Sequence, residues 1–193
     1  MSKLISRLIS LLIITCLASI SQAAVNAETD KSILRNLLQQ AVNDQTSFED
    51  QFHAQVWLLD MSNRLKAYIT DNKFRITLLK SIHFEANRTS LPAELMLAVI
   101  EVESNFDEYA ISVSGARGLM QIMPFWLNEI ELPDKNLFNV QTNLRMGSTI
   151  LKHYIDLEKG DLTKALARYN GSRGRAIYPN KVFKALNKHW FRQ

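Results

Sequence analysis

The feature that most constrains the fold is an apolar run in the middle of the chain, residues 95–100 (LMLAVI). A segment that is apolar on nearly every side is typical of a helix buried inside a domain, because a surface helix keeps a polar face. Pro92 precedes the run and fits the first turn of a helix, where its missing N–H costs no hydrogen bond. The sequence therefore predicts a helical domain built around this segment.

Elsewhere, apolar residues recur at a spacing of three and four residues, which predicts further helices. We expect them at residues 30–43, 47–70, 72–87, 119–130, 142–157 and 162–170, and from about Pro179 onward. Few windows alternate apolar and polar residues, so little or no sheet is expected. Residues 112–118 and 132–134 have the composition of a loop and a turn. Gly147 and Ser148 share a helix face, where small residues would let a neighbouring helix approach closely.

The first 23 residues have the pattern of a secretory signal peptide. Lys3 and Arg7 precede an apolar run at residues 8–20, and Ser21-Gln22-Ala23 supplies a cleavage site. The run falls short of the ~20 residues that a membrane span needs. We therefore expect cleavage after Ala23 and export to the periplasm, with an uncleaved anchor as the alternative. Cys16 lies in the run, but Thr15 before it does not fit a lipoprotein signal, which argues against lipid anchoring.

Charge and composition exclude several classes of function. Cleavage would remove two of the 23 Lys and Arg residues against 19 Asp and Glu, leaving a formal charge of +2, too weak to suggest nucleic-acid binding. The four histidines are scattered, no cysteine pair exists, and no glycine-rich phosphate loop occurs, so no metal or other cofactor is expected. The protein is expected to be a monomer.

The periodicity predicts two parts after the signal peptide. Residues 24–72 would form an N-terminal helical segment, and residues 73–193 a compact helical domain. The helices of the first part would either pack on the core or form an arm that docks to partners in an envelope or secretion complex. The sequence alone leaves both interpretations open.

Two acids end the buried segment, and helix geometry separates them. Glu101 and Glu103 are two residues apart, which corresponds to ~200° of rotation, so they point to nearly opposite faces. Glu103 continues the core stripe of Val99 and Ile100. Burial raises the pKa of a carboxyl, as a general acid near neutral pH requires. The alternative is a structural carboxylate paired with an Arg or Lys.

Three ordered motifs favour the catalytic interpretation of Glu103. They are residues 98–107 (AVIEVESNFD), 115–124 (GARGLMQIMP) and 165–171 (ALARYNG). In this order and spacing they resemble the soluble-lytic-transglycosylase (SLT) family over about residues 79–178. The resemblance implies an all-α, lysozyme-like (goose-type/SLT) helical domain, here with an N-terminal helical extension. The third motif continues with Gly171-Ser172-Arg173-Gly174, where many members have Ala-Gly-Pro-Gly, which leaves the local groove shape open.

The resemblance also assigns roles by position. Glu103 matches the catalytic glutamate, Ser112 a serine near the reacting sugar, and Tyr169 a tyrosine whose hydroxyl faces the catalytic carboxyl. Gln121 and Met123 match residues that line the glycan groove. From the residues alone, Tyr169 is core with a hydroxyl that needs a partner, for which Glu103 is suitable. Gln121 is equally a clamp on loop backbone, and Met123 a space-filling core residue.

The resemblance implies a peptidoglycan lytic transglycosylase. Such an enzyme cleaves the β-1,4 bond between N-acetylmuramic acid and N-acetylglucosamine and leaves a 1,6-anhydro end, with Glu103 acting first as acid and then as base. No second acid is placed opposite Glu103, since Asp107 and Glu108 resemble solvated loop residues. The alternatives are a lysozyme-type hydrolase that uses the same Glu103, or an inactive glycan-binding scaffold.

Overall fold

The computed structural model describes residues 51–128 and 136–191. Over these residues the chain forms α-helices, one 3₁₀ helix (η1) and one π-helix (η2), with two isolated β-bridges but no strand. The all-α class predicted from periodicity is therefore confirmed. The elements are α2 (Gln51–Leu65), α3 (Asn72–Thr89), α4 (Ala93–Ser104), η1 (Pro124–Asn128), α5 (Val140–Leu157), α6 (Leu162–Tyr169), α7 (Ile177–Ala185) and η2 (Leu186–Trp190).

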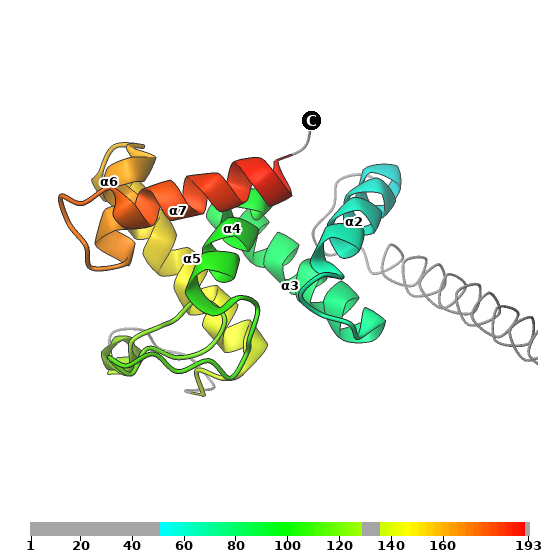
Figure 1. Cartoon of the computed structure of the whole chain (residues 1–193), viewed down its shortest axis with the longest axis horizontal. Helices are drawn as coiled ribbons and strands as arrows, with labels where there is room; N and C mark the ends of the chain where they lie inside the picture. Colours follow the sequence, from blue (N-terminus) through cyan, green and yellow to red (C-terminus); the bar gives the residue numbers. More distant parts are fainter. Residues whose placement is uncertain (1–50, 129–135, 192–193) are drawn as a thin grey trace, which may run out of the picture.

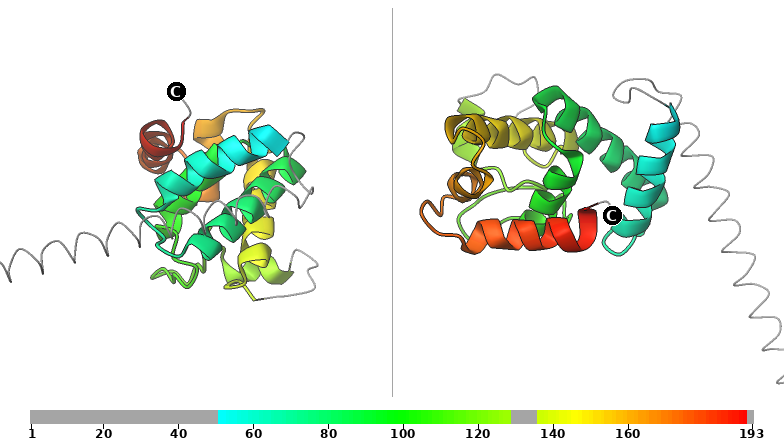
Figure 2. Two further views of the ribbon diagram at one scale, coloured as in Figure 1. Left: turned by 90° about the vertical axis from the view of Figure 1, so that its right-hand side faces the viewer. Right: turned by 90° about the horizontal axis from the view of Figure 1, so that it is seen from above.

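The apolar run forms the central helix, α4. It packs against α3, α7 and η2 (Figure 1), and in the right-hand view of Figure 2 it lies between α7 and the α3–α5 pair. Ala93 and every residue from Leu95 to Ile100 are buried, as predicted for a helix without a solvent face. Pro92 is the N-cap and not a residue of the first turn. This central position fixes the direction in which the end of α4 presents its side chains.

Most of the other predicted helices are present with shifted ends. The helix expected at 72–87 is α3, and α5 and α6 lie within two residues of their predicted bounds. Asp161 caps α6, because its carboxylate accepts a hydrogen bond from the Lys164 N–H at 3.0 Å. The helix expected at 47–70 ends at Leu65, and α7 begins at Ile177, two residues before Pro179. The helix predicted at 30–43 and the turn at 132–134 lie outside the described residues.

The predicted helix at 119–130 is wrong over the part that the structure describes. Residues 119–123 form a turn with a bridge between Arg117 and Ile122, and only the short η1 follows. Gln121 has a φ of 49°, in the left-handed region, which an α-helix cannot accommodate. Pro124 lacks the N–H that would continue a helix from the residues before it. The apolar content of this segment therefore reflects a buried loop.

This loop, and not a helix, packs against the face of α5 that carries the small residue Gly147. A Cβ atom built on Gly147 would lie 2.3 Å from Met120 Sδ and 2.7 Å from Met120 Cβ. The prediction that small residues permit a close approach is confirmed, with Met120 as the neighbour. The absence of a side chain at Gly147 lets the loop that carries the second motif lie directly on α5.

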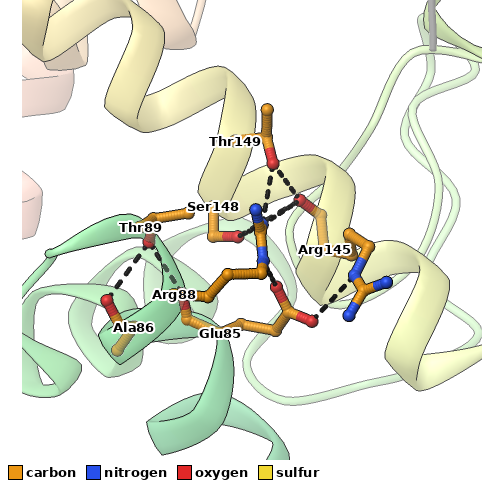
Figure 3. A network of polar contacts seen from close by, with 7 residues as sticks. All are labelled: Glu85, Ala86, Arg88, Thr89, Arg145, Ser148 and Thr149. Carbon is orange, nitrogen blue, oxygen red and sulfur yellow. Dashed lines mark hydrogen bonds and ion pairs between the residues drawn. The ribbon is translucent and has the colours of Figure 1, made fainter.

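A polar cluster joins α3 to the same helix (Figure 3). The buried Glu85 carboxylate accepts hydrogen bonds from Arg88 Nε at 2.5 Å and from Arg145 Nε at 3.0 Å. Arg88 also donates to the hydroxyls of Ser148 and Thr149, at 3.0 Å and 2.8 Å. Both carboxylate oxygens are thus satisfied, so this buried charge is paired.

The described part of the N-terminal segment belongs to the same core. Leu58, Met61 and Leu65 of α2 are fully buried and pack in one hydrophobic cluster with α3 and α4. This is the packing that the first interpretation of residues 24–72 expects, for the part from residue 51 onward. The boundary at residues 72 and 73 stays a prediction. In the described ranges no helix is both long enough and apolar enough to cross a membrane.

Candidate active site

Glu103 lies in the last turn of α4, at the point where the central helix ends. Burial raises the pKa of its carboxyl from 4.5 to about 7. The neighbouring Ser104 hydroxyl donates to the carbonyls of Ile100 and Leu119, at 3.1 Å and 2.8 Å, which ties the helix end to the second motif. The chain then leaves the helix through Asn105, the C-cap, with a φ of 52°. Glu103 is therefore a desolvated acid on a rigid support.

Two tyrosines, Tyr169 (half-buried) and Tyr178 (buried), share the environment of Glu103. Tyr169 ends α6 and Tyr178 lies in the first turn of α7. Burial, and then the negative charge of Glu103, raises the pKa of both phenols well above their ordinary value. Both hydroxyls therefore stay protonated near neutral pH, and they can donate hydrogen bonds but cannot act as bases. The third motif and the start of α7 converge on the end of α4.

Tyr178 is the residue that the sequence reasoning missed. Its hydroxyl lies near the Glu103 carboxyl. A hydrogen bond from this hydroxyl would lower the pKa of Glu103 and so offset part of the rise that burial causes. No hydrogen bond is formed between the two groups in the structure, and the buried Tyr178 hydroxyl has no other hydrogen-bond partner among the described residues. A helix predicted from Pro179 leaves Tyr178 outside it. The signal was the spacing of Tyr178, Val182 and Ala185, which is that of a buried helix face.

Tyr169 is half-buried near Glu103, but its hydrogen bond differs from the one expected. The Tyr169 hydroxyl donates to the Met120 carbonyl oxygen at 2.8 Å, and not to the Glu103 carboxyl. The expectation that a buried phenol needs a partner holds, while the choice of Glu103 as that partner is wrong. Tyr169 thereby holds the second motif in place beside the acid.

Gln121 acts as a clamp on the loop that it belongs to. Its side-chain Nε2 donates to the carbonyls of Ala110 and Gly118, each at 3.1 Å. These two bonds join the first part of the loop to the second and hold Gln121 in its left-handed conformation. One of the two interpretations left open by the sequence, the backbone clamp, is therefore the one that the contacts display. Contact with substrate stays a prediction.

The other two predicted residues lie in the same loop region, and neither forms a hydrogen bond or ion pair with Glu103 in the described part of the chain. Ser112 Oγ accepts the Ala116 N–H at 3.0 Å and lies 3.1 Å from Ser114 Oγ, so it shapes its own exposed turn. Met123 is half-buried immediately before η1. Their roles toward a sugar stay predictions.

Glu101 occupies a separate environment on the other side of α4. Its carboxylate accepts from Trp190 Nε1 at 2.7 Å and lies 2.8 Å from His189 Nδ1. One heptad earlier on the same helix, Glu94 accepts from Trp57 Nε1 at 2.8 Å. Both acids are thus satisfied by structural partners, which supports the separation of Glu101 from Glu103 predicted by helix geometry.

The remaining acids of the first motif region are not equivalent to each other. Asp107 is exposed and accepts the Tyr109 N–H at 2.9 Å. Glu108 is a half-buried turn residue, and burial followed by the charge of Asp107 raises its pKa, so it is less exposed than the sequence suggested. Neither contributes to the shifted pKa of Glu103. Across residues 51–128 and 136–191, no group of three His, Cys, Asp or Glu side chains could hold a metal ion.

Comparisons with known proteins show what this chain is similar to. One relative is a transglycosylase from Enterobacteria phage PRD1, 30% identical over 105 residues, which are 51% of this chain and 38% of the relative. Among solved structures, an inactive mutant of the lytic transglycosylase Slt from Pseudomonas aeruginosa has a TM-score of 0.47 at 18% identity, covering 79% of this chain and 33% of the other. The 70 kDa soluble lytic transglycosylase from Escherichia coli has a TM-score of 0.42 at 19% identity, covering 75% and 26%.

The chain thus spans well under half the length of each of these proteins. The model of one sequence family, described as the transglycosylase SLT domain, matches residues 80–190. This match contains all three motifs, the two tyrosines and Glu103, and it covers more than half of the chain. The chain therefore belongs to the transglycosylase SLT domain family.

Proposed function

We propose that this protein is a peptidoglycan lytic transglycosylase in which Glu103 is the catalytic acid and then the catalytic base. The observation that carries the proposal is the raised pKa of Glu103, about 7, at the end of a buried helix within the family's matched region. A carboxyl with a pKa near the working pH is protonated often enough to donate a proton and acidic enough to release it. The exported location follows from the substrate, and the signal peptide at residues 1–23 stays a prediction.

In the first step, the protonated Glu103 donates its proton to the oxygen that links N-acetylmuramic acid to N-acetylglucosamine. The bond between that oxygen and the muramic C1 breaks, and N-acetylglucosamine leaves as an alcohol. The substrate's own acetamido group stabilises the positive charge that develops at C1. Tyr178, whose hydroxyl lies near the carboxyl, can then donate to the Glu103 carboxylate as its charge appears.

In the second step, the Glu103 carboxylate removes the proton from the C6 hydroxyl of the same muramic acid. The C6 oxygen bonds to C1 and closes the 1,6-anhydro ring, and Glu103 recovers its proton. No water is consumed, so no second carboxylate is needed to activate one. The partners of the other acids support this route: Glu101 is held by His189 and Trp190, and Glu108 leaves the Glu103 pKa unaffected.

The test compares Glu103→Gln with Glu94→Gln on purified cell walls. Glu94 lies on the same helix, and a glutamine there can still accept the bond from Trp57, so this control keeps both fold and activity. We expect Glu103→Gln to lose at least about a hundredfold in rate, as is usual when a positioned acid is removed. Activity of Glu103→Gln within threefold of the control would contradict the assignment.

Analysis of the products separates the two reaction outcomes. Muropeptides with 1,6-anhydro ends are expected, whereas reducing-end muramic acid would assign the same Glu103 to hydrolysis. Intact walls with both the parent protein and the Glu94→Gln control would favour an inactive glycan-binding scaffold. Partners that dock through residues 24–72 are a separate proposal, tested by pull-down with and without that segment.

A further inference from the structure

The small net charge of this protein conceals an uneven distribution of charge along the chain. Residues 162–193, from α6 onward, contain eight Lys and Arg residues and no Asp or Glu. Because the whole chain has a formal charge of +4, residues 1–161 have a formal charge of −4. The segment that begins at α6 is therefore a cationic pole of the molecule, and such a pole attracts and orients anionic partners.

Most of the charge in this cationic segment is unpaired. Lys164 and Arg168 form ion pairs with Asp161 and Glu158, which precede the segment. The other basic residues that the structure describes there are exposed, and none forms an ion pair within the described part of the chain; they are Arg173, Arg175, Lys181, Lys184 and Lys188. Like charges without partners repel one another, so an anionic surface would relieve that repulsion.

Three of these cations lie around one recess. Lys181, Lys184 and Lys188 line a pocket of about 280 Å³ between the end of α4 and the α7–η2 segment. Their i, i+3 and i+7 spacing is that of one helix face. Among the described residues, the only carboxylate in the pocket lining belongs to Glu101, which already accepts a hydrogen bond from Trp190 Nε1 at 2.7 Å. The ammonium groups thus form a row that no acid in the described part of the chain neutralises.

Large apolar side chains extend the row at both ends. Ile177, four residues before Lys181, is 69% exposed, and Phe191, three residues after Lys188, is 59% exposed. We call the row and its two ends the α7–η2 face: Ile177, Lys181, Lys184, Lys188 and Phe191. The helices that carry it run along one edge of the molecule, as Figure 1 and the right-hand view of Figure 2 show. Cations flanked by exposed apolar side chains fit the interface of an anionic bilayer, where the cations meet headgroups and the apolar groups enter the acyl boundary.

Three properties of this face favour a lipid surface over a protein partner. Protein–protein interfaces are enriched in Arg and aromatic residues and depleted in Lys, whereas every cation of the α7–η2 face is a lysine. A lysine ammonium is a point charge on a flexible stem, which suits a fluid surface whose headgroups rearrange around it. Because residues 162–193 contain no acid, the face also has no alternation of charge that would fix the register of a protein partner.

We propose that the α7–η2 face docks the protein on bilayers that contain anionic phospholipid. The docking is peripheral and reversible, because a few exposed cations and two apolar side chains supply it. This role goes beyond the proposed function and does not depend on the chemistry of Glu103. In Figure 1 the loop of residues 107–123 lies on the opposite side of the molecule from α7, so a docked protein would hold this loop away from the bilayer.

The experiment measures sedimentation of the full chain with phospholipid vesicles. One set of vesicles contains equal parts of phosphatidylcholine and phosphatidylglycerol, and the other contains phosphatidylcholine alone. Apolar segments bind both sets alike, so the ratio of the two binding constants isolates the contribution of charge. The test variant carries Lys181→Gln, Lys184→Gln and Lys188→Gln. Each lysine near an anionic membrane strengthens binding about fivefold, so this ratio should fall about a hundredfold in the test variant.

Two further variants show whether the effect belongs to charge at this face. The control carries Lys66→Gln, Lys73→Gln and Lys80→Gln, which remove the same charge from the α2–α3 side of the molecule, and it should keep the ratio within about threefold of the parent protein. A conservative variant with Lys→Arg at the same three positions of the face should also keep the ratio, since the charge is unchanged. Raising the salt from about 0.1 M to about 1 M should abolish the preference of the parent protein for anionic vesicles. A test variant that retains the ratio, or a control that loses as much, would overturn the proposal.

Two other outcomes would assign the lysines to a different ligand. If the parent protein sediments with lipid-free cell walls through these lysines, and vesicles show no charge preference, the face binds an anionic wall polymer and the proposal is overturned. If inorganic phosphate releases the protein from vesicles more than chloride of the same ionic strength does, the pocket is a site for a free anion, which also overturns it. Glu103→Gln should bind vesicles as the parent protein does, so docking and catalysis can fail separately.

Discussion

The contact between Gly147 and Met120 predicts that the smallest available enlargement of α5 disturbs both stability and activity. In Gly147→Ala the new Cβ would lie 2.3 Å from Met120 Sδ and 2.7 Å from Met120 Cβ. The sulfur lies toward the flexible end of its side chain, but the Met120 Cβ is fixed to the backbone. That backbone accepts the Tyr169 hydroxyl and donates its N–H to Asn143, so a shift of Met120 is transmitted to the candidate site.

Two opposing effects determine the magnitude. Alanine is favoured over glycine in a helix interior by about 0.5–1 kcal/mol. Forcing an extra carbon into a packed core costs about 1–3 kcal/mol. The 2.7 Å contact with a backbone-anchored atom places the cost in the upper part of that range, so we expect Gly147→Ala to lower the free energy of unfolding by about 1–2 kcal/mol. For a chain of this size that is a decrease in Tm of about 3–6 °C.

Urea unfolding and cell-wall clearance measure the two consequences. The matched control is Gly160→Ala, where a Cβ meets nothing within 4 Å but the φ of +85° is strained, so stability falls without an effect on activity. The double variant Gly147→Ala with Met120→Ala should be less destabilised than the sum of the single variants, since the Met120 sulfur is then absent. A Gly147→Ala protein at least as stable as the parent, with full activity, would refute the reasoning.

Two further predictions concern the buried carboxylates. The raised pKa of Glu103 means that activity should fall as pH rises through about 7, and that the native state binds an extra proton between 4.5 and about 7. The free energy of unfolding should therefore decrease as pH rises from 4.5 to about 7. Urea unfolding at pH 5 and pH 8 should show this decrease in the parent protein but not in Glu103→Gln. Glu85→Ala removes two charge-assisted hydrogen bonds, and because Arg88 and Arg145 keep side-chain exposures of 35% and 46%, we expect a loss of about 2–3 kcal/mol. Lys152→Ala, which breaks only the exposed pair with Asp156, should cost less than about 1 kcal/mol, and equal losses in the two variants would contradict the role given to the Glu85 cluster.

What the sequence could predict depends on whether the deciding interactions are local. The burial of α4 and the desolvation of Glu103 follow from the order of apolar residues on a single helix, and both were predicted. The cap at Asp161 depends on residues only three positions apart and is local in the same sense.

The errors involve contacts between distant residues. The segment at 119–123 has the composition of a helix, but Gln121 is held in a left-handed conformation by the Ala110 carbonyl, 11 residues earlier, as well as by Gly118. The partner of Tyr169 is Met120, 49 residues away, and nothing in either local sequence specifies it. The helix α7 was predicted to begin near Pro179, because proline favours a first turn, but it begins at Ile177. Tyr178 was therefore not recognised as a residue of this helix.

The enclosure of α4 has a consequence for the evolution and engineering of this protein. A helix whose residues are buried from Leu95 to Ile100 tolerates few substitutions. It can position Glu103, but its sequence cannot vary enough to change substrate specificity. New specificity has to arise in the segments that touch the helix end without packing along it. A mutagenesis library that aims to change substrate choice should therefore leave α4 intact and vary the exposed residues of 107–117. In such a library the yield of folded variants should be high, because the mutable positions and the core are largely separate sets of residues.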